Sequence, residues 1–147
     1  MYAKKIKYKD FNGEEREETF YFSLMESELV EMETSMDGGL MEFGKRIIES
    51  KNVPEIMALF KKLILLTYGE KSPDGKYFIK EDPVRGKLAN YFMQSNAYSA
   101  LYMEFINNPE SGAEFFNNVI PAELAEEVAK SETATDGHAY PPSIAKV

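Results

Sequence analysis

Cysteine is absent from this sequence of 147 residues, which excludes disulfide bonds, thiol nucleophiles and cysteine-ligated zinc. Histidine occurs once, as His138, in a C-terminal stretch that has no periodic pattern. It is far in sequence from any carboxylate or hydroxyl group that we expect to be ordered. A catalytic triad and a histidine metal site are therefore excluded as well.

Long hydrophobic runs and an excess of positive charge are also missing. The longest strongly apolar run, IMALFKKLILL, is divided by Lys61 and Lys62 and is too short to span a bilayer. The N-terminus, MYAKKIKYKD, lacks the apolar core of a signal peptide. The net charge of −8 opposes binding to phosphate backbones, and the phosphate-binding patterns GxxxxGKS/T and GxGxxG do not occur. We expect a soluble, intracellular protein that binds neither nucleic acid nor membranes.

Alternating apolar side chains within residues 4–22 predict a β-hairpin. The apolar positions of its two strands are Ile6, Tyr8, Phe20 and Phe22. A two-residue turn at Asn12-Gly13 would place the two pairs on opposite faces, whereas a three-residue loop over 11–13, with Gly13 left-handed, places them on one face. The charged cross-strand pairs of this second register are Lys7–Glu17 and Lys9–Glu15.

From Ser23 onward the apolar residues recur at helical spacing, which predicts up to seven helices. They cover residues 23–38, 40–50, 54–68, 82–92, 96–108, 109–120 and 121–130. The helix at 54–68 is apolar around most of its circumference, so we place it at the centre of the core.

The predicted fold class is α+β, mainly α. An N-terminal β-hairpin is followed by a compact bundle of six to seven helices in a single domain, residues 1–130. The last stretch, 131–147, contains Gly137 and a proline pair and shows neither strand nor helix periodicity. We expect it to be a disordered, flexible tail.

The stretch GEKSPDGKYFIKE, residues 69–81, partly matches a calcium-binding EF-hand loop. The matching positions are Glu70, Ser72, Asp74, Gly75 and Glu81. However, Pro73 stiffens the loop, and the apolar Phe78 takes the ninth position, where an oxygen ligand belongs. We interpret the stretch as a Pro73-Asp74-Gly75 turn that leads into a short apolar strand, Tyr77–Ile79. That strand either packs onto the helical core or forms an edge that binds a partner.

Methionine is frequent, with eight residues. Three of them fall on one stripe of the first predicted helix, where they either fill the core or line an adaptable binding groove. The glutamates of the same helix point outward and indicate a solvated face, not catalytic acids. No catalytic, cofactor-binding or metal-binding residue is predicted. The candidate partner-binding residues are Met25, Met32, Met36, Tyr77, Phe78 and Ile79.

Four segments, taken in order, carry a resemblance to a known family. They are KIKYKDFNGEEREETFYFSLMESELVEME, MDGGL, FKKLILLTYGEKSPDGKYFIK and NAYSALYMEFINNPESGAEFFNNVIP. Together they resemble the small acidic tail assembly chaperones of long-tailed bacteriophages, over about residues 4–121.

This resemblance implies a non-enzymatic protein that binds the tape measure protein, which is long, helical and prone to aggregate. The chaperone would keep that protein soluble while tail tube subunits polymerise around it. The resemblance places this function in the host bacterial cytoplasm and implies absence from the mature virion. The tail tube protein is a further candidate partner, and formation of a homo-oligomer is open. An acidic exterior with available Met and aromatic side chains is compatible with reversible binding of apolar surface.

Two other classes of function are alternatives. A virion structural component, such as a tail completion or connector subunit, would be present in purified particles at a fixed copy number. An enzyme or a calcium-binding regulator is the third class, and its metal version predicts a melting temperature that changes with calcium and chelator.

Overall fold

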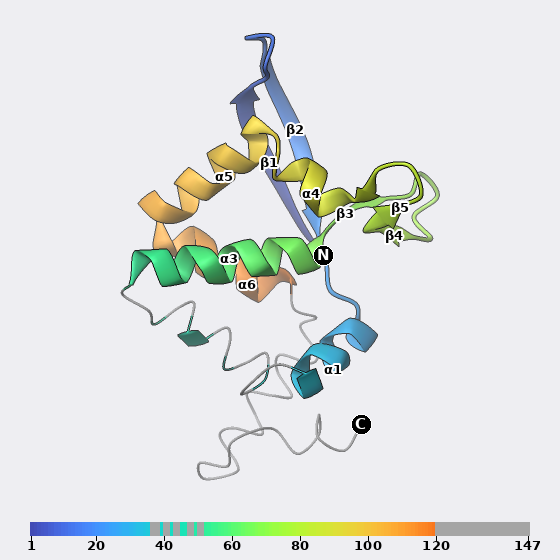
Figure 1. Cartoon of the computed structure of the whole chain (residues 1–147), viewed down its shortest axis with the longest axis vertical. Helices are drawn as coiled ribbons and strands as arrows, with labels where there is room; N and C mark the ends of the chain where they lie inside the picture. Colours follow the sequence, from blue (N-terminus) through green and yellow to red (C-terminus); the bar gives the residue numbers. More distant parts are fainter. Residues whose placement is uncertain (36–38, 40–41, 43–44, 47–48, 50–51, 120–147) are drawn as a thin grey trace.

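The computed structural model describes residues 1–35, 39, 42, 45–46, 49 and 52–119 (Figure 1). Its larger antiparallel sheet has the strand order β1-β2-β3-β4, and a smaller one pairs β5 with β6. The strands are β1 (Tyr2–Lys9), β2 (Glu15–Phe22), β3 (Tyr68–Lys71), β4 (Phe78–Ile79), β5 (Glu81–Asp82) and β6 (Gly86–Lys87). The helices are α1 (Glu26–Ser35), α3 (Val53–Thr67), α4 (Leu88–Phe92), α5 (Asn96–Asn107) and α6 (Pro109–Val119). The predicted mixed α+β class, with antiparallel strands first, is confirmed.

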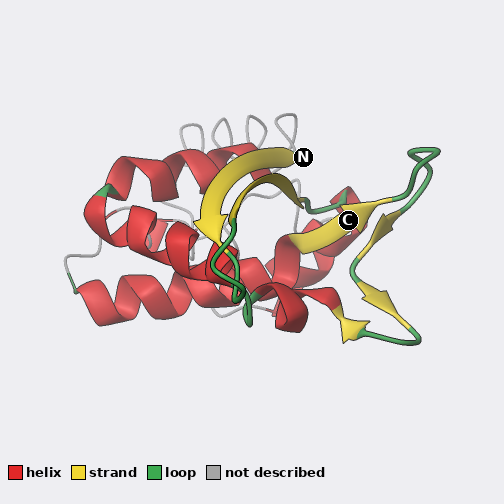
Figure 2. Ribbon diagram, turned by 90° about the horizontal axis from the view of Figure 1, so that it is seen from above, coloured by secondary structure: helices red, strands yellow, loops and turns green. Residues whose placement is uncertain are grey.

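The β1–β2 hairpin has the predicted register. Its charged cross-strand pairs include Lys7–Glu17 and Lys9–Glu15. The Asp10 N–H donates to the Glu14 carbonyl oxygen at 2.9 Å, which closes a three-residue loop, and Gly13 has a φ of 82°. Glycine suits this left-handed position because it has no Cβ. Figure 2 shows the hairpin lying against the helices. Ile6 and Phe22 are buried in the core.

An aromatic cluster joins the hairpin to the helices. The fully buried Phe22 ring lies with its centroid 5.6 Å from that of Tyr68, 5.8 Å from Phe92 and 5.1 Å from Phe115. Helix α3 adds the buried apolar side chains Met57, Phe60, Leu63 and Ile64. Full burial of each such large side chain contributes roughly 2–3 kcal/mol. Strand β2 and the helices are therefore held together by one continuous core.

Strand β3 follows α3 directly and extends the hairpin sheet, where the sequence predicted a helix end. Tyr68 pairs with Phe22 of β2, and Gly69 pairs with Tyr21. A Cβ on Gly69 would lie 2.6 Å from the Ile79 carbonyl oxygen, so this glycine permits close approach of the backbone of β4. The predicted turn and short apolar strand after it are confirmed, with β4 at Phe78–Ile79.

The helix predicted over 82–92 is wrong in its first half. Residues 81–87 form the β5–β6 strand pair instead, and α4 begins only at Leu88. The Asp82 carboxylate accepts hydrogen bonds from the Val84 N–H at 2.9 Å and the Arg85 N–H at 2.6 Å, and Gly86 has a φ of 70°. Aspartate that binds the backbone ahead of it stabilises a turn, and a left-handed glycine cannot continue an α-helix.

The structure has five helices in its described residues, not the six to seven predicted. The helix expected over 40–50 falls largely outside the described residues, and the helix expected over 121–130 falls wholly outside them. The domain boundary at residue 130 and the tail at 131–147 also lie outside. The remaining predicted helices are present as α1, α3, α5 and α6.

Candidate partner-binding surface

Helix α1 carries the first group of predicted partner-binding residues, and Met25 stands at its start. The Glu28 carboxylate accepts a hydrogen bond from the Met25 N–H at 2.9 Å, and the Leu29 N–H donates to the Met25 carbonyl oxygen at 2.9 Å. Met25 therefore occupies the N-cap position of the helix. Its side chain is 58% exposed.

The methionine stripe of α1 is divided between surface and core. Met32 is half-buried and packs against the core, next to the buried Leu29 of the same helix. Met36 lies outside the described residues. Of the glutamates predicted to point outward, Glu26 and Glu31 are exposed, whereas Glu28 and Glu33 are half-buried, so the solvated acidic face is confirmed only in part. The described part of the stripe thus offers one exposed methionine to a partner.

The second predicted group, Tyr77 to Ile79, is divided in the same way. Tyr77 is 66% exposed, whereas Ile79 is half-buried against the core. Phe78 is also half-buried, and its ring lies so close to Gly69 that a Cβ there would approach it to 2.6 Å. The segment is therefore divided between core and surface: Ile79 packs onto the core, and Tyr77 is exposed to solvent. Binding of a partner by this segment stays a prediction.

Lys80 brings the two predicted groups together, although they are far apart in the sequence. Its Nζ donates to both Glu28 carboxylate oxygens, at 2.9 and 2.8 Å, and to the Leu66 carbonyl oxygen at 2.9 Å. Because Glu28 also accepts from the Met25 N–H, one carboxylate links the start of α1 to the residue that follows β4. The Lys80 Nζ also lies 5.9 Å from the centroid of the Phe78 ring. Sequence spacing alone could not predict this contact.

The side chains of the calcium-like stretch hold a turn. One Asp74 oxygen accepts from the Ser72 hydroxyl at 2.7 Å and from the Lys76 N–H at 3.1 Å, and Gly75 has a φ of 76°. Glu70 instead forms an ion pair with Arg85. Among the residues that the structure describes, no three His, Cys, Asp or Glu side chains are grouped so that they could hold a metal ion.

Sequence reasoning missed Val84, whose side chain is 94% exposed in the β5–β6 turn. The Arg85 guanidinium donates to both Glu70 carboxylate oxygens at 2.9 Å, and its Nε donates to Asp82 at 2.7 Å. These bonds fasten the turn to β3. The signal was present in DPVRG, where an aspartate, a proline and a glycine surround the exposed valine.

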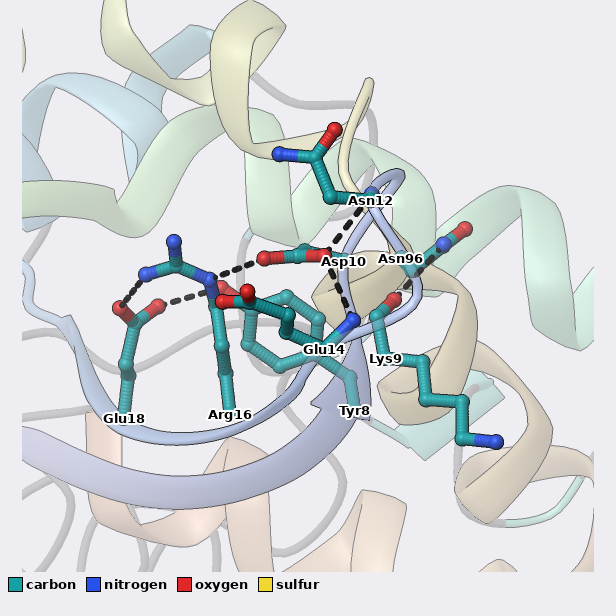
Figure 3. A network of polar contacts seen from close by, with 8 residues as sticks. All are labelled: Tyr8, Lys9, Asp10, Asn12, Glu14, Arg16, Glu18 and Asn96. Atoms are coloured by element: carbon teal, nitrogen blue, oxygen red, sulfur yellow. Dashed lines mark hydrogen bonds and ion pairs between the residues drawn. The ribbon is translucent and has the colours of Figure 1, made fainter.

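A polar network anchors the tip of the β1–β2 hairpin (Figure 3). Phe11, in the loop at this tip, is 81% exposed. One Asp10 oxygen accepts from the Asn12 N–H at 2.9 Å and from the Glu14 N–H at 3.0 Å. The other accepts from Arg16 Nε at 2.7 Å. The loop therefore presents its phenylalanine from an anchored backbone.

The same network continues down the hairpin and onto α5 (Figure 3). The Tyr8 hydroxyl donates to Glu18 at 2.5 Å, and the Asn96 side chain donates to the Lys9 carbonyl oxygen at 2.9 Å. Helix α5 is capped by Ser95, whose hydroxyl accepts from the Tyr98 N–H at 3.4 Å. Asn96, the first residue of α5, uses its side chain to bind the hairpin.

The pKa shifts resolved in the described part of the chain all reinforce the usual charge states at neutral pH. The hydrogen bond from Arg16 lowers the pKa of Asp10, and the hydrogen bond from Ser72 lowers the pKa of Asp74. Burial raises the pKa of Tyr68 to about 12. Acid–base catalysis near neutrality favours a pKa near 7, which none of these shifted groups approaches.

The character of the helices and the similarity to known proteins both bear on the class to which this chain belongs. Within its described residues the chain has no helix that is both long and apolar enough to cross a membrane. No curated protein and no solved structure matches the sequence. A family model described as phage tail assembly chaperone matches residues 1–144. The chain therefore belongs to the phage tail assembly chaperone family.

Proposed function

We propose that this chaperone binds the phage tape measure protein and keeps it soluble while tail tube subunits assemble around it. Membership of the family over residues 1–144 carries this proposal. We further propose that it acts in the host cytoplasm, without catalysis, and that it is absent from the finished virion. The tape measure protein is the partner that the resemblance of the four sequence segments implies. The exposed Met25 at the start of α1 is compatible with such a partner.

We propose that the tape measure protein binds at the start of α1, around Met25. Met25 offers a flexible, polarizable side chain that is 58% exposed at the start of α1. The exposed Glu26 and Glu31 of the same helix add negative charge that keeps this part of the surface hydrated. Such an arrangement suits weak and reversible contact with many apolar segments of a long helix, because methionine adapts to irregular partners.

Co-expression with the tape measure protein tests this function. The wild-type chain should raise the soluble fraction of that protein several-fold, and Met25→Asp should remove most of the effect, because a charge would have to be buried at the contact. Aspartate is a favoured N-cap residue, so this variant should fold at least as stably as the wild type. Met103→Asp, which alters a 49%-exposed methionine on α5, is the matched control and should retain activity.

Two results would contradict the proposal. If the tape measure protein stays insoluble with the wild-type chain, the proposed function is wrong. If Met25→Asp and Met103→Asp lower its soluble fraction equally, binding at α1 is wrong. Mass spectrometry of purified virions separates the chaperone from a tail completion or connector subunit. A chaperone should be missing from these particles, whereas a structural subunit should be present at a fixed copy number.

A further inference from the structure

Strand β2 has a free edge along most of its length. The strand runs from Glu15 to Phe22, and on the side away from β1 only Tyr21 and Phe22 pair with β3. Beyond that point β3 leaves β2 and pairs with β4. Residues 15–19 are all exposed, and Figure 1 shows the tip of the hairpin extending beyond the helices. They include three glutamates and one arginine, so we call residues 15–19 the acidic β2 edge.

The hydrogen-bond pattern of the hairpin shows which backbone groups point away from β1. Opposed residues of an antiparallel pair alternate between those that exchange hydrogen bonds and those whose N–H and C=O groups point outward. Asp10 and Glu14 form a bonded pair, because the Asp10 N–H donates to the Glu14 carbonyl oxygen. The outward-pointing residues of the acidic β2 edge are therefore Glu15, Glu17 and Thr19.

The other end of the strand shows the same alternation. The Ser23 N–H points away from β1 and donates to the Thr67 carbonyl oxygen at 2.9 Å. Glu17 and Thr19 have the same parity as Ser23, but β3 does not reach them. Among the residues that the structure describes, no further partner bonds to the backbone of Glu17 or Thr19. The edge thus offers unpaired donors and acceptors to an added strand.

The opposite edge of the hairpin, on β1, is different because helix α5 is bonded to it. Asn96 of α5 donates to the Lys9 carbonyl oxygen at 2.9 Å, and Glu104 lies 2.8 Å from the Lys4 Nζ. A helix that covers an edge is one way in which proteins prevent strand addition. Within the described part of the chain, no helix is bonded in this way to the acidic β2 edge.

The charges of the acidic β2 edge indicate which strand would fit it. Side chains directly opposite in neighbouring strands attract when their charges differ and repel when they are alike. On β1, Lys9 lies opposite Glu15 and Lys7 lies opposite Glu17. A strand on the free side of β2 would meet the same two glutamates, whereas the β1 lysines would lie two strand spacings away, about 10 Å. Basic residues at alternate positions therefore complement this edge.

The Glu17 carboxylate has capacity for a further cation. Its oxygens lie 3.5 Å from Lys5 Nζ and 3.4 Å from Lys7 Nζ, longer than a direct charge-assisted hydrogen bond. A second copy of this chain is a poor partner, because antiparallel pairing of two such edges about Glu17 places glutamate opposite glutamate. We propose that the acidic β2 edge binds an extended basic segment of another protein by antiparallel strand addition, with lysine or arginine opposite Glu15 and Glu17.

A peptide copy of the strand that β2 already accepts tests this proposal. The probe is acetylated and amidated KKIKYK, residues 4–9, added to the full-length chain. NMR hydrogen exchange reports each amide separately. At ten times the Kd of the peptide, the Glu17 and Thr19 amides should exchange about tenfold more slowly, because binding occupies their free N–H groups. The Arg16 and Glu18 amides point toward β1 and should change much less.

A control peptide tests the charge of the partner. It has the same length and carries Lys7→Glu and Lys9→Glu, which places glutamates opposite those of the edge. It should bind at least tenfold more weakly than KKIKYK.

Three variants of the chain separate the backbone of the edge from its charge. Thr19→Pro removes an N–H that points away from β1, so the hairpin should stay folded while peptide binding is largely lost. Glu15→Gln/Glu17→Gln keeps every backbone group and should weaken binding several-fold. The matched control is Glu26→Gln/Glu31→Gln on α1, which changes the net charge equally and should bind like the wild type. Melting temperatures check the folding of each variant, and the β2 glutamate variant decides if the proline unfolds the hairpin.

Several results would overturn the proposal. They are a wild-type chain that does not bind KKIKYK, equal affinity for the two peptides, and equal loss in the α1 control variant. Binding that leaves exchange at Glu17 and Thr19 unchanged would show a nonspecific charge contact instead of an added strand. Slower exchange at these two amides, with weaker binding by the β2 variants alone, would support it. Failure of the peptide to bind would leave the tape measure proposal intact, because that function was assigned to Met25 at the start of α1.

Discussion

The turns of the β1–β2 hairpin and the β5–β6 pair use the same chemistry but differ in their support. In each, an aspartate ahead of a three-residue loop accepts two backbone N–H groups and an arginine Nε at 2.7 Å. The pairs are Asp10 with Arg16 and Asp82 with Arg85. The first turn ends two strands of eight residues, whereas β5 and β6 have two residues each.

This comparison shows that local turn chemistry needs support from its surroundings. The long hairpin has many cross-strand pairs of its own, and its alternation was visible in the sequence. The short pair depends on Glu70 of β3 and on one further backbone bond, from the Leu88 N–H to the Lys80 carbonyl oxygen. Its strands are too short to show a period.

The largest effect should come from overpacking β3, the strand that supports the short β5–β6 pair through Glu70. Gly69→Ala would place a Cβ 2.6 Å from the Ile79 carbonyl oxygen, so β4 must move away from β3. Overpacking of this kind typically costs about 2–3 kcal/mol of the free energy of unfolding. Gly13→Ala meets nothing within 4 Å and carries only the left-handed strain, about 1 kcal/mol. Urea denaturation measures the free energy of unfolding of both variants. A larger loss in Gly13→Ala than in Gly69→Ala would contradict the comparison between the two turns.

The next effect concerns the link that Lys80, the residue after β4, makes with Glu28 of α1. Lys80→Met removes three hydrogen bonds and leaves the Glu28 carboxylate, only 26% exposed, without its cation. We expect a loss of about 2 kcal/mol and faster amide exchange in α1. Lys5→Met is the control, since that lysine is 67% exposed and lies 3.5 Å from Glu17. It should change stability little. Equal losses would show that the position of Lys80 has no special role.

A smaller and sharper test compares the two aspartates by their pKa values. Both are lowered, by the Arg16 side chain first for Asp10 and by the Arg85 backbone N–H first for Asp82. Arg16→Gln should therefore raise the pKa of Asp10 more than Arg85→Gln raises that of Asp82. Carboxyl ¹³C NMR titration measures both changes.

The same lowered pKa values determine how these turns respond to acid. The stabilisation is present above the unfolded-state pKa of about 3.9 and is lost as the pH falls through the lower folded-state values. Both turns should therefore be intact at pH 5 to 7 and weaken together in acid, on the order of pH 4 and below. Weakening of either turn near neutrality would contradict this sign.

The smallest effect is expected at the two exposed tips. Phe11→Ser and Val84→Ser each alter a side chain with more than four-fifths of its surface in water, at 81% and 94% exposure. Each should change the free energy of unfolding by less than about 0.5 kcal/mol in thermal denaturation. A loss above about 1 kcal/mol in either variant would show that this tip packs against the rest of the protein.

Elements with local signals were predicted correctly, and contacts between distant segments were not. The hairpin register followed from the facing of Ile6 and Phe22, and α3 followed from its apolar circumference. Strand β3 was missed because Tyr68 becomes a strand residue only by pairing with Phe22, far back in the sequence. In the candidate surface, helical spacing placed Met25 and Met32 on one stripe and left core and surface positions open, and the tertiary packing separates the exposed Met25 from the half-buried Met32. The link through Lys80 depends on tertiary packing and could not.

Pairing of β2 with β3 has a consequence for synthesis of this protein on the ribosome. The Ser23 N–H donates to the Thr67 carbonyl oxygen, and Phe22 of β2 pairs with Tyr68 of β3. Both contacts can form only after α3 has been synthesised. Until then the inner edge of β2 stays open, with unpaired backbone groups beside a large apolar ring. A nascent chain of this chaperone is thus itself prone to aggregate, and slow translation between the two segments would lengthen that exposure.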